Sequence, residues 1–112
     1  MKISIITTNF NTEKYLEQTI KSILGQKGDF DLEYIITDGG SKDNSLKIIK
    51  KYDKEVKDGK WGNRVVLKYL SEKDKGQSDG INKGLRMATG DIVAFLNADD
   101  LYTEGALDKV TK

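Results

Sequence analysis

The feature that most constrains the fold of this chain is the alternation of short, β-branched apolar runs with segments of helical periodicity. The apolar runs cover residues 3–7, 32–37, 65–70 and 92–96. Such runs are typical of strands that are buried on both faces of a parallel sheet. Helices are predicted between them, from Thr12 to the Gly25 stop, over about 43–52 and over about 78–88. Strands that alternate with helices imply right-handed crossovers, so we predict an α/β fold with a mostly parallel sheet.

The third predicted helix contains two glycines. Ile81, Leu85 and Ala88 have helical spacing and supply its apolar positions, although Gly80 and Gly84 interrupt it. Each glycine costs a helix on the order of 1 kcal/mol relative to alanine. Their presence suggests that a backbone or a ligand approaches this helix closely. A last helix is predicted after residue 102, with Thr103 as its cap.

The residue types that are missing exclude several kinds of chemistry. The chain has no Cys and no His. Disulfides, thiol nucleophiles, Cys/His zinc sites and Ser-His-Asp triads are therefore excluded. The remaining carboxylates, amides and hydroxyls are hard oxygen ligands, which suit magnesium, manganese or calcium.

Length and charge narrow the class of protein further. The 112 residues suffice for one domain at most, and 19 basic against 18 acidic residues give a net charge of +1. A nucleic-acid-binding domain usually carries a basic excess, so no nucleic-acid partner is expected. No apolar stretch approaches the roughly 20 residues of a spanning helix, and the N-terminus lacks a long apolar signal region. We therefore expect a cytoplasmic protein.

The ends of the predicted strands carry the candidate site residues. In parallel α/β sheets, ligands bind outside the carboxyl ends of the strands. Asp38 follows the second strand, and the adjacent carboxylates Asp99 and Asp100 follow the fourth and could hold a divalent ion. Taken singly, these aspartates are equally compatible with ordinary turns at strand ends. Residues 7–11 contain no glycine and the chain has no P-loop string, so a Rossmann dinucleotide site and a P-loop are not predicted.

Four ordered motifs make the chain recognisable. Ser-Ile-Ile-Thr-Thr-Asn-Phe-Asn occupies 4–11, Ile-Ile-Thr-Asp-Gly-Gly-Ser-Lys-Asp occupies 35–43, Asn-Lys-Gly occupies 82–84, and Ala-Thr-Gly-Asp at 88–91 precedes Phe-Leu-Asn-Ala-Asp-Asp at 95–100. In this order they resemble the nucleotide-binding half of family 2 glycosyltransferases, which have the Rossmann-like GT-A fold. The resemblance spans nearly the whole chain. The Asp-Gly-Gly-Ser and Asn-Ala-Asp-Asp variants resemble members that build bacterial surface polysaccharides.

This resemblance implies a binding site for a nucleoside diphosphate sugar. Thr8 and Phe10 would contact the base, and Phe10 stands where the family more often has Tyr. Asp38 would read the uracil edge, which favours a UDP-linked donor over GDP or dTDP donors.

The resemblance also implies a Mn²⁺ or Mg²⁺ ion. Asp99 would be its ligand and Asp100 a possible helper, whereas Asn97 occupies the place of the first Asp of the family motif. A neutral amide is a weaker ligand for the ion, but it can bond a ribose hydroxyl or a phosphate-bound water. Asp79 and Asn82 correspond to the segment that flanks the nucleotide and the donor sugar. Asn82 could equally hold its loop in place.

Family 2 members invert the anomeric centre, and the acceptor is the hydroxyl of a saccharide or of a lipid-linked saccharide. Inversion needs a general base, which in the family lies well downstream of the metal motif. We therefore expect the base beyond Lys112, and no catalytic residue is assigned in this chain. Residues 1–112 are predicted to be the N-terminal donor-binding half of an incomplete domain, inactive alone, with uncovered apolar surface that could drive self-association.

Two other functions are compatible with part of this pattern. A non-catalytic nucleotide-sugar binding module would also lack a base. A sugar nucleotidyltransferase shares the general fold, but it needs a Gly- and Arg-rich loop where this chain has residues 8–11. Attachment at the inner face of a membrane is compatible with the sequence, although no amphipathic segment argues for it. Trp61 lies in a polar loop, where packing is favoured over ligand stacking.

Overall fold

The computed structural model describes residues 1–26 and 28–97. Within them the order of elements is β1 (Lys2–Asn9), α1 (Glu13–Leu24), β2 (Asp31–Asp38), α2 (Ser45–Lys57), β3 (Val65–Ser71), α3 (Gln77–Met87) and β4 (Ile92–Phe95). The strands pair in parallel in the order β3-β2-β1-β4. The predicted α/β class and parallel sheet are confirmed. The predicted last helix and its cap Thr103 lie outside the described residues.

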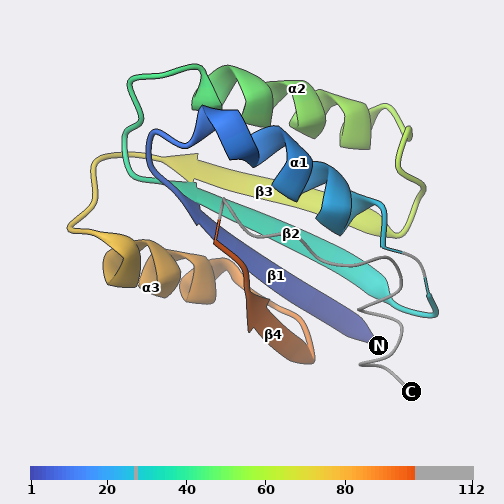
Figure 1. Ribbon diagram of the computed structural model, residues 1–112. Coiled ribbons are helices and arrows are strands. Elements are labelled where there is room, and N and C mark those ends of the chain that lie inside the picture. The colour runs from blue at the N-terminus through green and yellow to red at the C-terminus, as the bar shows by residue number, and fades with distance from the viewer. Residues whose placement is uncertain (27, 98–112) are drawn as a thin grey trace.

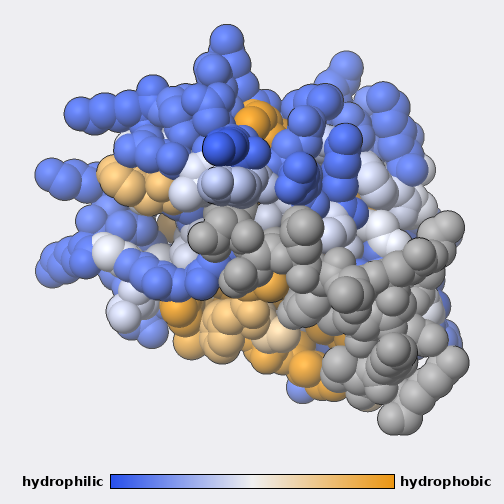
Figure 2. Space-filling view, in the orientation of Figure 1, coloured by the Kyte–Doolittle hydropathy of each residue, from blue (hydrophilic) through white to orange (hydrophobic). Residues whose placement is uncertain are grey.

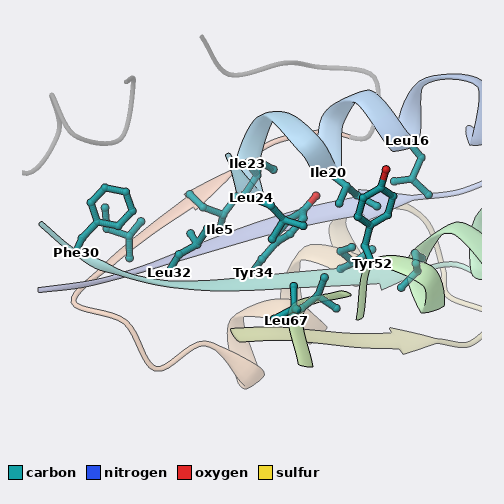
Figure 3. Close-up of a cluster of buried hydrophobic side chains, with 14 residues drawn as sticks. Ile5, Leu16, Ile20, Ile23, Leu24, Phe30, Leu32, Tyr34, Tyr52 and Leu67 are labelled. Atoms are coloured by element: carbon teal, nitrogen blue, oxygen red, sulfur yellow. The ribbon is translucent and has the colours of Figure 1, made fainter. Parts of the chain in front are cut away.

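The main core lies between the sheet and two helices. Helices α1 and α2 cover one face of the sheet and α3 covers the other (Figure 1). Ile5, Tyr34 and Leu67 are register partners on neighbouring strands, and all three are buried. The side chains of α1 pack onto them, with Leu16, Ile20 and Ile23 fully buried (Figure 3). This apolar layer fixes the strand register, because a slip by one residue would turn these side chains to the other face.

The start of α1 differs from the prediction. Thr12 occupies the N-cap position, but its hydroxyl donates to Asn9 Oδ1 instead of capping the helix. The free Glu13 N–H is bound by Asp43 Oδ2 at 3.1 Å, while Asp43 Oδ1 accepts the Ser45 N–H at 2.9 Å. One carboxylate from the β2–α2 loop therefore binds the first turns of both α1 and α2. This contact joins segments far apart in sequence, which local capping rules do not detect.

Helix α3 packs on the sheet through its glycines. Gly80 and Gly84 are its buried residues, whereas Leu85 is 44% exposed. The apolar positions expected to face the sheet therefore do not form the buried stripe. A Cβ on Gly84 would lie 2.6 Å from Ile6 Cγ2, and Thr37 Oγ1 donates to the Gly80 carbonyl at 3.0 Å. The predicted close approach is confirmed, and it is the sheet that approaches the helix.

Among the described residues, an apolar surface is exposed on the side of α3 and β4. Leu85, Val93 and Phe95 are exposed there, and hydrophobic side chains gather over these two elements (Figure 2). Strand β4 pairs with β1 only, so it forms one edge of the sheet as described. No helix among residues 1–26 and 28–97 is long and apolar enough to cross a membrane.

A fully buried carboxylate lies on the α3 face of the sheet. Glu33 accepts hydrogen bonds from Ser4 Oγ and Lys68 Nζ, both at 2.7 Å, and from the Thr89 N–H at 2.8 Å. Burial raises the pKa of Glu33, but these hydrogen bonds outweigh it and lower that pKa to about 2. Gly90 is needed beside them, because a Cβ there would lie 2.5 Å from Ser4 Oγ. The group ties β1, β2 and β3 to the loop that enters β4.

Candidate functional site

The carboxyl ends of three neighbouring strands meet at one edge of the sheet. The parallel register places Asn9 beside Asp38 and Asp38 beside Ser71. The arrowheads of β1, β2 and β3 point to the same side in Figure 1, where the loops that follow them lie next to the start of α3. This is the edge at which ligands bind in parallel α/β sheets.

Asp38 is the organising residue of this edge. Its carboxylate accepts Asn9 Nδ2 at 2.7 Å, Ser71 Oγ at 2.8 Å and the Ser41 N–H at 2.9 Å. The Ser41 hydroxyl and the Gly40 N–H also donate to it, at 2.5 Å and 3.2 Å. The side chain is only 2% exposed. Asp38 therefore joins the last residues of β1 and β3 to the loop that follows β2.

These donors determine the charge of Asp38. Burial raises the pKa of the carboxyl, but the hydrogen bonds from Ser41, Asn9 and Ser71 together outweigh it, so the pKa lies below its ordinary value. Asp38 is therefore an anion at neutral pH. Its oxygens are occupied by protein donors, and it lies under the loops without lining the adjacent cavity.

A cavity of about 520 Å³ opens above this network. It contains three of the predicted site residues, namely Thr8 near the end of β1, Phe10 directly after β1, and Asn97 after β4. The remaining lining comes from both sides of the sheet edge: Asn9, Thr12, Gly39, Lys73, Asp74, Gly76 and Gln77. The volume is in the range of sites for small ligands and cofactors.

The loop after β1 presents Phe10 to this cavity. Asn11 adopts a left-handed conformation with φ 52°, which Asn tolerates better than most residues. Its N–H donates to Ser41 Oγ at 2.8 Å, and its Oδ1 accepts the Lys42 N–H at 2.8 Å. Phe10 is 59% exposed and lies outside the buried core. An exposed aromatic ring at a cavity provides a flat apolar surface for a planar ligand.

The predicted residues on α3 lie elsewhere. Asp79 Oδ2 accepts the Lys75 N–H at 3.0 Å and lies 3.4 Å from Lys83 Nζ, which also pairs with Glu72 at 3.0 Å. The Lys75 hydrogen bond is the main reason that the pKa of Asp79 is lowered. Asn82 is exposed on the same helix. Neither residue lines the cavity among the described residues.

The predicted metal ligands follow the described part of β4. Asn97 lines the cavity, and its Oδ1 accepts a hydrogen bond from Gln77 Nε2. Asp99 and Asp100 lie outside the described residues. Among residues 1–26 and 28–97, no group of three or more His, Cys, Asp or Glu side chains could hold a metal ion.

Several cavity residues were not predicted as site residues. Lys73, Asp74, Gly76 and Gln77 come from the β3–α3 loop and the first residue of α3, and Gly39 follows β2. A positive φ of 87° at Gly40 brings the β2–α2 loop within contact of the Lys73 backbone. These residues follow the third strand, and ligands bind outside the carboxyl ends of parallel strands. Their place after a strand is therefore the sequence signal that points to them.

A second, smaller hollow of about 220 Å³ lies at the opposite edge of the sheet. It is lined in part by Phe30, Trp61 and Arg64. The Trp61 ring lies 6.3 Å from that of Tyr52, and its Nε1 donates to Glu55 Oε1 at 3.1 Å. The predicted packing role of Trp61 is therefore confirmed.

Comparison with known proteins agrees with this geometry. The model of the family "Glycosyl transferase family 2" matches residues 4–112. The chain belongs to glycosyl transferase family 2. An uncharacterized glycosyltransferase of Nostoc sp. is 36% identical over 112 residues, which are 100% of this chain and 32% of that protein. A GalNAc(5)-diNAcBac-PP-undecaprenol beta-1,3-glucosyltransferase of Campylobacter jejuni is 36% identical over 107 residues, 95% of this chain and 32% of that protein.

A solved structure extends this family assignment to the fold. Residues 1–349 of S. aureus TarS in complex with UDP match with a TM-score of 0.79 at 27% identity, over 99% of this chain and 31% of that one. The α/β arrangement is that of the GT-A glycosyltransferases, as predicted. This family 2 chain spans about a third of the length of each of these three proteins.

Proposed function

We propose that this chain forms the donor-binding half of an inverting glycosyltransferase that transfers sugar from a UDP-sugar to an acceptor hydroxyl in polysaccharide or glycoconjugate synthesis. The observation that carries the proposal is the cavity at the carboxyl edge of the sheet, where Thr8, Phe10 and Asn97 come together. The UDP complex of the related TarS structure supports the choice of nucleotide.

The two sides of the cavity suggest how the donor lies. In the sheet order β3-β2-β1-β4, the β2 and β3 loops contribute Gly39, Lys73 and Asp74, while β4 contributes Asn97. Phe10 follows the intervening strand β1. In our proposal the base stacks on Phe10 toward the β2 and β3 loops, and the diphosphate extends toward β4. Thr8 lies on the floor between them. Asp38 supports this arrangement from below by fixing the loops.

The metal site is proposed at the β4 side. Asp99 would hold Mn²⁺ or Mg²⁺ with help from Asp100, and the amide of Asn97 adds an oxygen at the described end of the cavity. This all-oxygen donor set fits a hard divalent cation. When bound, the ion would neutralise the diphosphate leaving group. The only lysine that lines the described cavity, Lys73, lies on the other side of β1.

In the proposed reaction, the acceptor oxygen forms a bond to the anomeric carbon on the face opposite the diphosphate, and the bond from that carbon to the diphosphate breaks. The acceptor hydroxyl loses its proton to a general base, which we place beyond Lys112. Residues 1–112 would therefore bind donor and transfer little sugar. The undecaprenol-linked substrate named for the Campylobacter relative supports a lipid-linked acceptor and a peripheral location at the inner membrane face.

Calorimetric titration with UDP, with and without Mn²⁺, tests the proposed donor site. We expect heat of binding that depends on the metal and is lost in Asp99→Ala. Asp58→Asn, an exposed change beyond α2, is the matched control and should bind as the unmodified chain does. Binding of UDP with equal affinity in the absence of metal, or in Asp99→Ala, would contradict the metal assignment. Absence of UDP binding under all conditions would contradict the donor site itself.

The uncovered apolar surface supports self-association as part of the proposal. Leu85, Val93 and Phe95 form it, from α3 and β4. Large exposed apolar patches mark surfaces that pack against protein. Sedimentation velocity at increasing concentration should show a growing dimer fraction, which Phe95→Ser should reduce. A monomer at the highest concentration would contradict this part.

A further inference from the structure

Helix α2 carries a row of lysines on the side that faces away from the core. Ile49, Tyr52 and Val56 belong to the core cluster. The other side of the helix carries five exposed lysines, which we call the lysine face: Lys47, Lys50, Lys51, Lys54 and Lys57. Positions 47, 50, 54 and 57 are three or four residues apart, so these side chains lie along one side of the helix. Helix α2 is therefore amphipathic, with one side in the core and a cationic side in solvent.

The acidic residues near these lysines are mostly engaged by the protein. Over 42–60 the chain has seven lysines and four acidic residues. Asp43 accepts two backbone N–H groups at the starts of α1 and α2, and Glu55 accepts Trp61 Nε1 at 3.1 Å. Asp53 is paired with Lys57 at 2.8 Å, and its side chain is only 14% exposed. The acids interrupt the lysines in the sequence, but three of the four are engaged in the structure, so the exposed side of α2 is cationic.

Most of the lysine face is available to an external anion. Lys47, Lys50 and Lys54 make no side-chain hydrogen bond or ion pair with any residue within 1–26 and 28–97. Lys51 pairs with Glu17 at 3.0 Å, but an exposed pair of this kind is weak in water. Outside 42–60 the chain has twelve basic and fourteen acidic residues. The positive charge of this nearly neutral chain is therefore concentrated around α2.

The two faces of the sheet consequently differ in character. Hydrophilic side chains project from the α2 side at the top of the view, whereas hydrophobic ones gather over α3 and β4 (Figure 2). Helices α2 and α3 cover opposite faces of the sheet (Figure 1). The cavity opens at the carboxyl edge between these faces, and no residue of α2 lines it. A flat partner on the lysine face would therefore lie next to the cavity without closing it.

We propose that the lysine face binds the phosphate groups of an anionic phospholipid bilayer. This inference rests on the proposed function, which places the acceptor on a lipid at the inner membrane face, and it adds the surface that contacts the bilayer. Clusters of roughly four to eight basic side chains on an amphipathic helix are attracted by the negative potential of such a leaflet. Neither of the two cavities described above is lined by a lysine of this face, so a broad surface fits it better than a small ligand.

Co-sedimentation of the full chain with lipid vesicles tests this proposal. We expect binding to vesicles of phosphatidylcholine with about one third phosphatidylglycerol, and none to phosphatidylcholine alone. Raising the salt from about 0.1 M to about 0.5 M should release the chain, because the attraction is screened. The double variant Lys50→Gln with Lys54→Gln keeps good helix formers on α2 and should bind at least about tenfold more weakly.

The matched control removes the same charge elsewhere. Lys75 and Arg86 are exposed and lie outside α2, so Lys75→Gln with Arg86→Gln has the same net charge as the double variant of the lysine face. We expect this control to bind vesicles as the unmodified chain does. Calorimetric titration with UDP and Mn²⁺ should give the same affinity for Lys50→Gln with Lys54→Gln as for the unmodified chain, because both lysines lie outside the cavity.

Three results would overturn the assignment. Equal weakening in the two double variants would show that net charge, and not the lysine face, determines binding. Equal binding to both kinds of vesicle would remove the role of anionic headgroups. Soluble polyphosphate that binds the lysine face as tightly as the vesicles do would identify an anionic polymer, and not a bilayer, as the partner.

The two titrations also distinguish this inference from the proposed function. An unmodified chain that binds UDP but no anionic vesicle contradicts the membrane surface and leaves the donor site in place. An unmodified chain that binds anionic vesicles through the lysine face but no UDP contradicts the donor site and supports the membrane surface.

Discussion

Two buried carboxylates, Glu33 and Asp38, lie on the same strand but on opposite faces of the sheet, and they are stabilised differently. Glu33 faces α3 and is paired with two lysines, with Nζ of Lys68 at 2.7 Å and of Lys2 at 3.5 Å. Asp38 faces the other side, and within residues 1–26 and 28–97 its donors are all neutral, from Asn9, Gly40, Ser41 and Ser71. Both carboxyls have lowered pKa values.

The difference separates a residue of the scaffold from a residue of the site. Cations neutralise Glu33, so it joins strands without influencing a ligand. Asp38 keeps its negative charge beside the cavity and joins the ends of β1 and β3 to the loop that follows β2. A buried charge without a counterion is tolerated where several hydrogen bonds replace water. We therefore expect changes at Glu33 to affect stability alone and changes at Asp38 to affect ligand binding as well.

The largest effect on stability is expected for Glu33→Ala. The change leaves Lys68 and the Thr89 N–H without their shared acceptor, although each lysine can reach water because its side chain is 37–38% exposed. We expect a loss of about 3 kcal/mol in the free energy of unfolding, measured with urea, and UDP affinity within about twofold of the unmodified chain. Glu72→Gln alters the ion pair between the half-exposed Glu72 and Lys83, which keeps its second partner Asp79, and should cost less than about 0.5 kcal/mol. A cost for Glu33→Ala as small as that of the control would contradict the scaffold role.

Lowering the pH should remove the contribution of Glu33 to the free energy of unfolding, and the loss should be similar in size to that of Glu33→Ala. The pKa of Glu33 is lowered from 4.5 to about 2, so the unfolded chain binds its proton first as the pH falls. The contribution is complete above pH 4.5 and is lost as the pH falls toward 2. The pKa difference corresponds to about 3 kcal/mol. Urea unfolding at several pH values should show this slope in the unmodified chain and a shallower slope in Glu33→Ala. Identical slopes would contradict the assignment.

Gly90→Ala should disturb the Glu33 group from the loop that enters β4. The new Cβ would lie 2.5 Å from Ser4 Oγ and 2.8 Å from Ser4 N, and a backbone atom cannot move cheaply. We expect a loss of about 2 kcal/mol in unfolding free energy, with no change in UDP affinity. Ser4→Gly removes the nearest contact of the new Cβ but also a hydrogen bond to Glu33, so it serves as its own reference. If the clash is the cause, Gly90→Ala should cost less in the Ser4→Gly background than in the unmodified chain.

Asp38→Asn should show how Asp38 differs from Glu33, because a change at Asp38 is expected to weaken ligand binding as well as stability. The amide NH₂ would face donors from Asn9 or Ser71, so some of the five hydrogen bonds must be lost. We expect a cost of about 1–2 kcal/mol in stability. We also expect a fall of about tenfold in UDP affinity, because loops that are less firmly held bind less tightly. An affinity equal to that of the unmodified chain would show that Asp38 does not organise the cavity.

Much of the fold follows from the sequence because its elements are locally encoded. The β-branched runs 3–7 and 32–37 lie inside β1 and β2, and Leu16, Ile20 and Ile23, which have helical spacing, form the buried face of α1. The third helix was predicted at nearly its observed place. Its packing was not, because the period of Ile81 and Leu85 cannot indicate that the sheet approaches through Gly80 and Gly84.

The site was only partly predictable, because local sequence patterns do not indicate contacts between distant segments. Thr8, Phe10 and Asn97 were expected from the family resemblance, and the structure brings them to one cavity at the carboxyl ends of β1 and β4. Asp74 lies in an irregular loop, and its position depends on contact with Gly39 across the sheet edge. Likewise, the engagement of Asp38 depends on Ser71, 33 residues later. Such long-range contacts have no periodic signal in a single sequence.

The most direct test of the central claim is to map UDP binding by amide chemical shifts, with Mg²⁺ as the ion. We predict that the largest changes fall at residues 8–12, 39–41, 73–77 and 97, around the cavity at the carboxyl edge. Changes at the smaller hollow of the opposite edge, near Trp61 and Arg64, should be negligible. Shifts concentrated at that opposite hollow, or spread evenly over the molecule, would contradict the account.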